Sequence, residues 1–408
     1  MTDYRPQRPS HSLSSSLWTY QDAIEHLLDV FDTPRTDLKV LRQMKRSVLR
    51  AYRDLPNKHR WRCYKSRRIL TTAPSQTTGT CAFDLAGGAY ERVVTLSGAT
   101  FPATARFYRI NIGGVHYPID TYESSTEVTL PENENPGADV AAGTSYTLYR
   151  DCYPLPVDFR KLGWLFDVTA KREIRDVPAE DVHAHSVFFG SPSTPSMAAI
   201  HEAGEFFGGM QLQFGPPPST ARTYDMTYLR HPRPLLVEKL NTGTVSTSGT
   251  TVTCSDSVFD ANKHVGSVIR FSSDTNDPTG PAGDADDSDN PYTAQRIIQS
   301  VTSATEVVID TALSAEVTSK NYVVSDPLDL NAGAMLTYFL RLCETEFSRL
   351  ANREDRHERR SGSDRELLEA MAADSRVFAP SELGADAMTP FHKREWSTIS
   401  DEVVNASV

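Results

Sequence analysis

The sequence predicts a mixed α+β protein, in which helices from both chain ends form a hub and two similar small β-barrels or sandwiches are inserted between them. Three observations favour this class. Apolar residues recur with a helical period near both ends, they alternate with a period of two in two internal blocks, and these blocks resemble each other. With 408 residues, the chain has room for about two to four domains.

The chain begins with a polar arm, residues 1–16. Thr19 and Asp22 then have the spacing of a capping box, and the apolar residues that follow, as far as Phe31, have helical spacing. Pro34 separates this helix from the next one. We therefore expect a first helix of about three turns.

A second helix is expected to begin near Thr36 and to end at Pro56. Only about four residues join it to the first helix, so the two form an antiparallel hairpin. Its apolar residues share one face, and most of its Lys and Arg residues lie on the other face.

Two blocks of alternating residues, separated by Gly and Pro, predict the β domains. Gly113-Gly114 between two alternating runs predicts a hairpin. Ser124–Leu130 of the first block resembles Ser303–Ile309 of the second, and Tyr146–Asp151 resembles Tyr322–Asp326. This likeness indicates a duplicated β unit; the alternative is chance similarity between short β segments.

Further elements are expected between and after the two blocks. They are a short helix at Phe159–Val168, strands at His201–Phe214 and Thr223–Leu229, an amphipathic helix from Met335 to Leu350, and another helix capped by Ser363 and Glu366. The predicted segments are an arm (1–16), the helical hairpin of the hub (17–70), the first β domain (75–152), a mixed hub segment (153–240), the second β domain (241–327), the C-terminal hub helices (328–378) and an extended docking tail (379–408).

Charge is spread unevenly along the chain. The formal net charge is −11, yet residues 35–68 hold thirteen Lys or Arg against two Asp, which leaves −22 for the rest. Such asymmetry indicates a surface for nucleic acid or for an acidic protein; the alternative is a solvated helix face without a partner. The residues predicted to form this surface are Arg42, Lys45, Arg46, Arg50 and Arg53.

The C-terminal tail has no periodicity, and its apolar residues are isolated. This pattern is typical of a segment that docks on another protein. Phe391 and Trp396 are the predicted anchors of the docking tail.

No catalytic or metal site is predicted, and no cofactor. The motifs GxxxxGK, GxGxxG and GxSxG are absent. His201 opens a zincin-like pattern, but Glu205 stands where the second His is required. His183 and His185, on one face of a possible strand, lack a third ligand, and the loop at 284–290 lacks the Gly and Glu of a calcium site.

Composition predicts a protein made in the cytoplasm. Five scattered cysteines without a CxxC pair argue for a reducing compartment. No apolar run reaches the length of a membrane span, and the first residues lack the apolar core of a signal peptide. Cys63 has basic neighbours but no His or Asn pattern, so a thiol nucleophile is not expected.

Several features together resemble one family. They are the helix hairpin Tyr20–Leu55, the transition Trp61–Leu70 into a strand, the turn Tyr153–Arg160 of the form YxLPxDF, the β segment Leu212–Tyr228 around a Pro cluster, and the helix Met335–Leu340. Over about half of the chain, the arrangement resembles the head-to-tail adaptor, or head-completion, proteins of tailed bacteriophages, especially the tail-tubular type of short-tailed phages.

The resemblance implies a homo-oligomeric ring, commonly a dodecamer, at the head–tail junction of the virion. Such a ring docks beneath the portal protein, continues the DNA channel and meets a downstream tail, nozzle or stopper protein. Capsid or tail-fibre contacts and sequence-independent contact with packaged DNA are further implied partners, whereas no membrane and no enzymatic activity are implied.

Three other functions remain open at this point. A tail, baseplate or fibre-attachment protein would use the duplicated β domains to bind a protein or a glycan. A cell-wall or DNA hydrolase would need paired carboxylates, of which Glu202 and Glu205 are an unremarkable example. A DNA-binding regulator would use the basic stretch, but no base-reading motif accompanies it.

Overall fold

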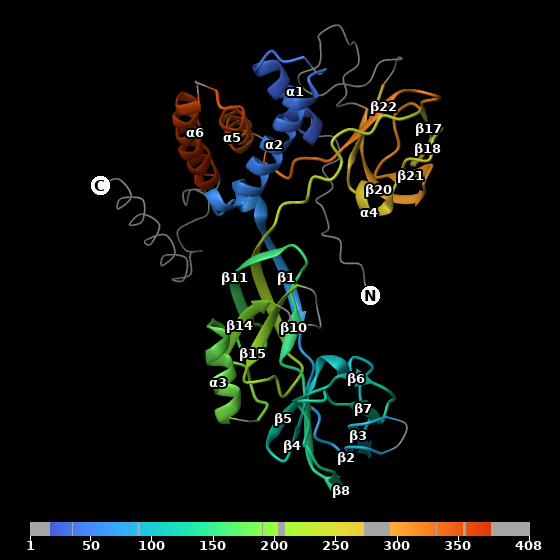
Figure 1. The fold of residues 1–408 in the computed structure, drawn as a ribbon, viewed down its shortest axis with the longest axis vertical. Coiled ribbons are helices and arrows are strands. Elements are labelled where there is room, and N and C mark those ends of the chain that lie inside the picture. The colour runs from blue at the N-terminus through green and yellow to red at the C-terminus, as the bar shows by residue number, and fades with distance from the viewer. Residues whose placement is uncertain are drawn as a thin grey trace, which may run out of the picture. The chain divides into compact units, whose positions relative to one another are not determined.

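The computed structural model describes residues 17–34, 36–87, 90–189, 191–202, 209–272, 294–331, 333–353 and 356–376. These residues form six α-helices and 22 β-strands, which confirms the mixed α+β class (Figure 1). The chain divides into two compact units. Unit 1 contains Tyr64–His231; unit 2 contains the described residues before Tyr64 and after His231. None of the helices among the described residues has the length and apolar character needed to cross a membrane.

Unit 1 includes the first β block, which is the described part of residues 75–152. Its strands are β2 (Thr80–Asp84), β3 (Val93–Ser97), β4 (Arg109–Ile112), β5 (Val115–Pro118), β6 (Thr121–Tyr122), β7 (Glu127–Thr129), β8 (Val140–Thr144) and β9 (Tyr146–Tyr149). They form a five-stranded sheet in the order β6-β7-β3-β2-β8 and a three-stranded sheet in the order β5-β4-β9. Gly113 and Gly114 both have positive φ in the β4–β5 turn, as the predicted hairpin requires.

The rest of unit 1 consists of two four-stranded sheets and one helix. The elements are β1 (Lys65–Thr71), β10 (Cys152–Pro154), β11 (Phe159–Asp167), β12 (Arg172–Glu173), β13 (Arg175–Asp176), α3 (Ala179–Phe189), β14 (Met197–Glu202), β15 (Met210–Gly215) and β16 (Thr223–Arg230). The sheets have the orders β1-β16-β11-β12 and β10-β15-β14-β13. Phe159, Phe214, Tyr224 and Met226 are buried in the core of this region.

Two predictions in this region were wrong. The segment predicted as a helix, Phe159–Val168, instead contains strand β11 (Phe159–Asp167), because these residues pair with β16. Its spaced apolar residues suit either structure, and the long-range pairing decides. His183 and His185 lie on helix α3, not on a strand; Glu180 in its first turn favours the helix electrostatically.

Unit 2 includes the second β block, which is the described part of residues 241–327. Its elements are β17 (Val245–Ser248), β18 (Thr251–Cys254), the short helix α4 (Ala261–His264), β19 (Val268–Phe271), β20 (Gln295–Ser303), β21 (Glu306–Ile309) and β22 (Tyr322–Ser325). They form one six-stranded sheet in the order β17-β18-β21-β20-β19-β22. Val252, Ile269, Ile298 and Val307 are fully buried at its centre.

The two β blocks have corresponding strand pairs. The first two strands of each block pair with each other (β2–β3 and β17–β18), the second pairs with a later strand (β3–β7 and β18–β21), and the third pairs with the last (β4–β9 and β19–β22). Tyr146 donates its hydroxyl to the carbonyl oxygen of Thr78 over 2.8 Å, and Tyr322 donates to that of Thr242 over the same distance. Each tyrosine begins the last strand of its block.

A second hydrogen bond recurs ahead of the short helical turn in each block. The backbone N–H of Phe101 donates to the carbonyl oxygen of Ser125 (2.7 Å), and that of Phe259 donates to Ala304 (2.8 Å). Ser125 and Ala304 lie within the stretches that resemble each other in sequence. The likeness of the two blocks therefore extends to individual backbone contacts.

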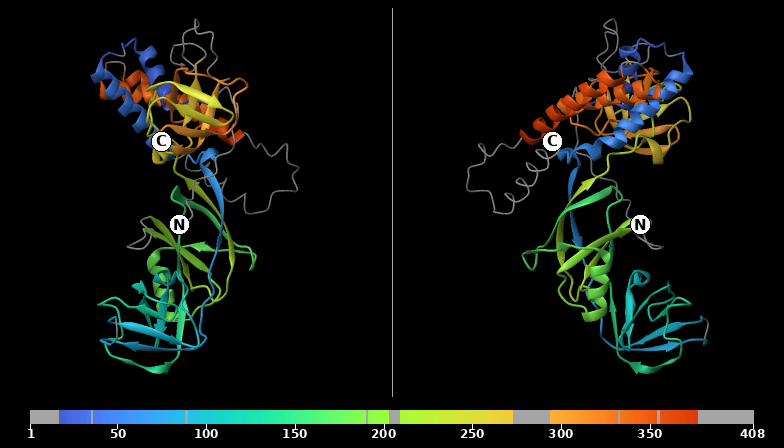
Figure 2. Two further views of the ribbon diagram at one scale, coloured as in Figure 1. Left: turned by 90° about the vertical axis from the view of Figure 1, so that its right-hand side faces the viewer. Right: turned by 60° about the vertical axis from the view of Figure 1, so that its left-hand side comes forward.

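The helices of unit 2 come from both sides of the second β block. They are α1 (Tyr20–Val30), α2 (Leu38–Lys58), α5 (Ala334–Leu350) and α6 (Arg356–Arg376). Figures 1 and 2 show α5 beside both α2 and α6. Tyr52 of α2 meets Phe339 of α5 edge to face, with ring centroids 6.1 Å apart. The aromatic rings are thus part of the contact between helices that are distant in sequence.

The ends of α1 and α2 follow from their local sequence. The capping box of Thr19 and Asp22 is confirmed, with both of its hydrogen bonds present. Asp37 caps α2 through the backbone N–H groups of Lys39 and Val40. The helix does not stop at Pro56 as predicted but continues to Lys58. Leu55 and Pro56 are both buried, and their packing offsets the helix hydrogen bond that the proline removes.

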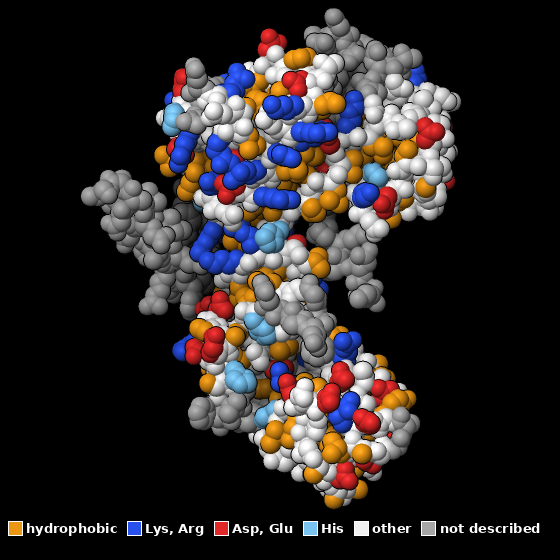
Figure 3. Space-filling view, in the orientation of Figure 1, with side chains coloured by type: hydrophobic (Ala, Val, Ile, Leu, Met, Phe, Trp, Pro, Cys, Tyr) orange, Lys and Arg blue, Asp and Glu red, His pale blue; other side chains and the backbone are white. Residues whose placement is uncertain are grey.

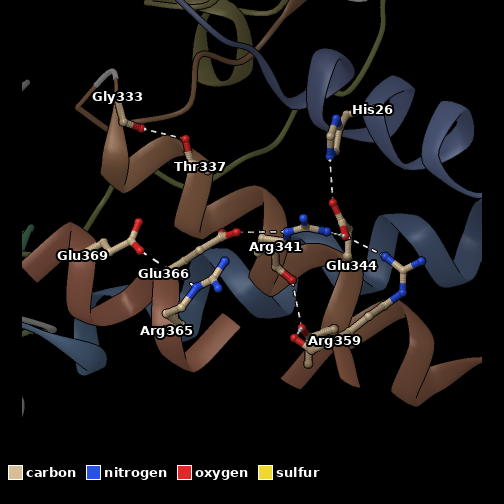
Figure 4. A network of polar contacts seen from close by, with 10 residues as sticks. His26, Gly333, Thr337, Arg341, Glu344, Arg359, Arg365, Glu366 and Glu369 are labelled. Atoms are coloured by element: carbon tan, nitrogen blue, oxygen red, sulfur yellow. Dashed lines mark hydrogen bonds and ion pairs between the residues drawn. The ribbon is translucent and has the colours of Figure 1, made fainter. Parts of the chain in front are cut away.

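A buried carboxylate connects α1, α5 and α6. Glu344 of α5 accepts hydrogen bonds from Arg341 (2.8 Å) and Arg359 (2.7 Å) and contacts His26 of α1 at 3.1 Å (Figure 4). Burial raises the pKa of Glu344, but the bonds from His26 and Arg341 outweigh burial and leave this pKa below its usual value. The carboxylate therefore stays charged between its three partners.

The cap predicted at Ser363 was wrong. Helix α6 begins at Arg356, and Ser363 lies buried within it. Arg359 and Glu366, on either side of Ser363, are both bonded to α5, through Glu344 and Arg341 respectively. These contacts keep the chain helical across residues that would otherwise favour a break.

Helix α1 is also joined to the second β block. The guanidinium of Arg270, on β19, donates to both carboxylate oxygens of Asp22, at 2.7 and 2.8 Å. The side chain of Arg270 is 2% exposed and that of Asp22 is fully buried. Gln21 and Tyr20 add backbone N–H bonds to Ser325 and Asp326 of the block. The start of α1 is therefore held against β19 and β22.

A single buried carboxylate connects the beginning and the end of the second β block. Asp326 accepts hydrogen bonds from Arg233 (2.8 Å), from the backbone N–H groups of Leu236 (2.6 Å) and Val237 (2.8 Å), and from the hydroxyl of Ser267 (2.7 Å). Its side chain has no exposed surface. Four donors satisfy this buried charge.

Candidate functional site

Helix α2 has one buried face and one basic face. Met44, Val48, Ala51 and Leu55 are completely buried. Each residue turns the helix by about 100°, so five cations lie on the opposite side, within a sector of about 80°. They are Lys39, Arg42, Arg46, Arg50 and Arg53, and all are exposed. Packing of the apolar face thus fixes the direction of the basic face.

The structure brings together four of the five predicted surface residues and separates the fifth. Arg42, Arg46, Arg50 and Arg53 share the basic face. Lys45 lies about 100° from its centre and is half-buried. Lys45 is ion-paired with Glu238. The lysine therefore belongs to the contact between α2 and the segment before the second β block.

The four exposed arginines differ in their partners. The Nε atom of Arg50 lies 3.2 Å from a carboxylate oxygen of Glu346 on α5, and Arg349 shares that carboxylate. Arg42, Arg46 and Arg53 have no ion-pair partner anywhere in the described part of the chain. Three guanidinium groups on this face are thus available to a ligand.

One residue of the face was missed from the sequence. Lys39 lies three residues before Arg42, on the same side of the helix, and this spacing could have identified it. The carboxylates that engage Lys45 and Arg50 lie far away in sequence, so no local pattern could reveal them. In Figure 3, Lys and Arg side chains gather over α2 and the helices beside it.

The remainder of the basic stretch is not part of this face. Lys58 is paired with Asp54, 2.9 Å away, one turn earlier on α2. Arg67 lies on β1 in unit 1, where its guanidinium donates two hydrogen bonds to Asp225. This bonding raises the pKa of Arg67. The charge excess of residues 35–68 is therefore divided between the two units, and three of its unpaired cations, Arg42, Arg46 and Arg53, are on α2.

The other predicted candidates do not assemble into a site. His201 lies on strand β14, and its ring contacts the amide of Gln211 at 3.1 Å. Cys63 contacts the sulfur of Met335 at 3.7 Å. The tail anchors Phe391 and Trp396 and the acidic loop at 284–290 lie outside the described residues. In the part that the structure describes, no three His, Cys, Asp or Glu residues are grouped as metal ligands.

Comparison with known proteins found no matching family model, no matching curated protein and no matching solved structure.

Proposed function

We propose that this chain is a structural protein of a tailed-phage virion: a head-to-tail adaptor that forms a ring between portal and tail and continues the DNA channel. The observation that carries the proposal is the basic face of α2. The helix is held by its buried side, and Arg42, Arg46 and Arg53 remain unpaired in the described structure. A fixed array of cations suits a protein that binds an anionic partner.

The arrangement of the helices supports the proposed hub. Helices α1 and α2 precede the second β block and α5 follows it, yet they pack together through Phe31–Phe347 and Tyr52–Phe339 contacts. The two β blocks are then insertions of one duplicated unit, supported by their corresponding strand pairs and tyrosine hydrogen bonds. Such insertions leave the hub free to form the ring.

The proposed assembly is homo-oligomeric, with head-to-tail contacts between copies that close into a ring of twelve. Its partners are the portal protein on one side and a tail, nozzle or stopper protein on the other, with the virion head–tail junction as its location. The predicted docking tail, residues 379–408, would dock on a neighbouring copy or on the portal, with Phe391 and Trp396 as anchors.

The test is mass photometry of the purified chain alone and after mixing with a portal ring. We expect a complex whose mass exceeds that of the portal by a fixed number of copies, together with a ring in negative-stain images. A chain that stays monomeric and ignores the portal would overturn the proposal.

A further inference from the structure

We infer that the basic face of α2 binds the phosphate backbone of duplex DNA, and that Arg42, Arg46 and Arg53, with Lys39 beside them, make the contacts. Lys45 and Arg50 are instead assigned to the fold. The inference rests on the proposed function, because it names the partner of the same surface. The alternative partner for this face is an acidic protein.

The composition of the face favours DNA over an acidic protein. Between Lys39 and Asn57, every position within the sector of about 80° that holds the basic face is polar or cationic, and the half-buried Leu49 lies just outside it. The large exposed hydrophobic residue of the helix, Leu38, lies at its first position. Protein interfaces have an apolar or aromatic centre, whereas a phosphate backbone needs only cationic donors.

The spacing of the arginines suits a strand of phosphates. At a rise of about 1.5 Å per residue, Arg42 and Arg46 are about 6 Å apart along the helix, and Arg46 and Arg53 are about 10 Å apart. Arg42 and Arg53 are about 16 Å apart, a length that spans about five phosphates of one strand. Each guanidinium can donate two parallel hydrogen bonds to one phosphate.

The face also distinguishes duplex from single-stranded DNA. Proteins that hold single strands stack the bases on exposed aromatic side chains. The aromatic residue of α2, Tyr52, is buried at 3% exposure against α5. The face therefore offers contacts to phosphates and none to unstacked bases, and binding is independent of sequence.

The test is fluorescence anisotropy of a labelled duplex of about 30 mixed base pairs, titrated with the full chain at several salt concentrations. Four phosphate contacts predict that affinity falls about 150-fold between about 50 and 200 mM salt. The variant R42Q/R46Q/R53Q should lose most of the binding and most of this salt dependence. Unchanged binding by this variant would overturn the inference.

The matched control is K45Q/R50Q, which removes two charges from the same helix. Because both residues are engaged by carboxylates, we expect its DNA affinity to change less than twofold and its melting temperature to fall. A loss of binding as large as that of the triple variant would overturn the assignment.

Two competitors test the partner class. Poly-glutamate of matching charge should displace the duplex poorly, and a single strand of the same length should bind more weakly. Equal competition by poly-glutamate would assign the face to an acidic protein, and tighter binding of the single strand would exclude the duplex; either result overturns the inference.

A final measurement separates this inference from the proposed function. The triple variant, mixed with the portal ring, should still form the complex seen by mass photometry. Ring formation by wild type without DNA binding would overturn the inference and leave the adaptor proposal standing. DNA binding without a portal-dependent ring would overturn the adaptor proposal and leave the phosphate contact standing.

Discussion

The two β blocks share strand pairing but differ in what covers the outer side of one strand pair. In the second block, Arg270 and Ser325 face outward from β19 and β22, are both 2% exposed, and bond to α1. By register, Asn111 of β4 is the counterpart of Arg270; it is only half-buried and contacts His116 of its own block. A few outward-facing residues thus decide whether this β architecture packs against helix α1, as in the second block, or does not, as in the first.

The largest effect is expected from breaking the attachment of the second block. Arg270→Ala leaves the carboxylate of Asp22 buried without its cationic partner, with the backbone N–H of Thr19 still donating to it, and should lower the free energy of unfolding by about 3–5 kcal/mol. Urea unfolding measures this change. The comparison is Arg109→Ala in the first block. Arg109 is 40% exposed, and its partner Asp151, although only 6% exposed, also accepts a hydrogen bond from Gln213, so this loss should be smaller.

Equal losses for these two variants would contradict the difference drawn between the blocks. The double variant D22N/R270M serves as a second control, because removing both charges avoids leaving one of them unpaired. It should be more stable than Arg270→Ala. A double variant that is no more stable than the single one would show that the cost is lost packing rather than a stranded carboxylate.

A smaller and equal effect in both blocks is expected at the recurring tyrosines. Tyr146→Phe and Tyr322→Phe each remove one hydrogen bond to a backbone carbonyl and should each cost about 0.5–1.5 kcal/mol. Differential scanning calorimetry of the two variants measures the losses. A loss confined to one block would break the correspondence between them.

The smallest effect is expected on the stability of the protein as the pH is lowered. Burial holds the pKa of His116 in the first block and of His264 in the second below the usual value. The folded state then binds fewer protons than the unfolded state, so stability is full above the unfolded pKa of about 6.5 and declines as pH falls below it.

Unfolding free energies measured between about pH 7.5 and 5 should therefore fall in the wild type. His116→Gln and His264→Gln should each reduce this loss of unfolding free energy by the contribution of the histidine that is replaced. Variants with the same pH dependence as the wild type would show that other groups cause it.

Local patterns predicted much of the fold, and long-range contacts account for what they missed. The hairpin at Gly113-Gly114 depends on neighbouring residues, so the sequence contains the necessary information. Phe159–Val168 depends on pairing with β16, some sixty residues later, and its local period misled the prediction. Helix α6 passes through Ser363 for the same reason, since contacts with α5 hold it.

The candidate site was likewise predictable in its local features and unpredictable where distant residues contribute. The basic face could be read from the spacing of Arg42, Arg46 and Arg53 around a helix. The roles of Lys45 and Arg50 could not be read, because they are set by Glu238 and Glu346, which approach α2 only after the chain has folded. A charge count gives the size of a basic surface, whereas folding decides which of its members are available.

Asp326 has a mechanical consequence for the second β block. Its carboxylate holds Arg233, Leu236 and Val237, before the block, to the residue that ends the block, so the two points of attachment lie together. Tension applied along the chain would act on these hydrogen bonds together, before it acted on strands β17 and β22. Pulling experiments on Asp326→Ala should therefore unravel the block at lower force, because the load would then pass through the strands themselves.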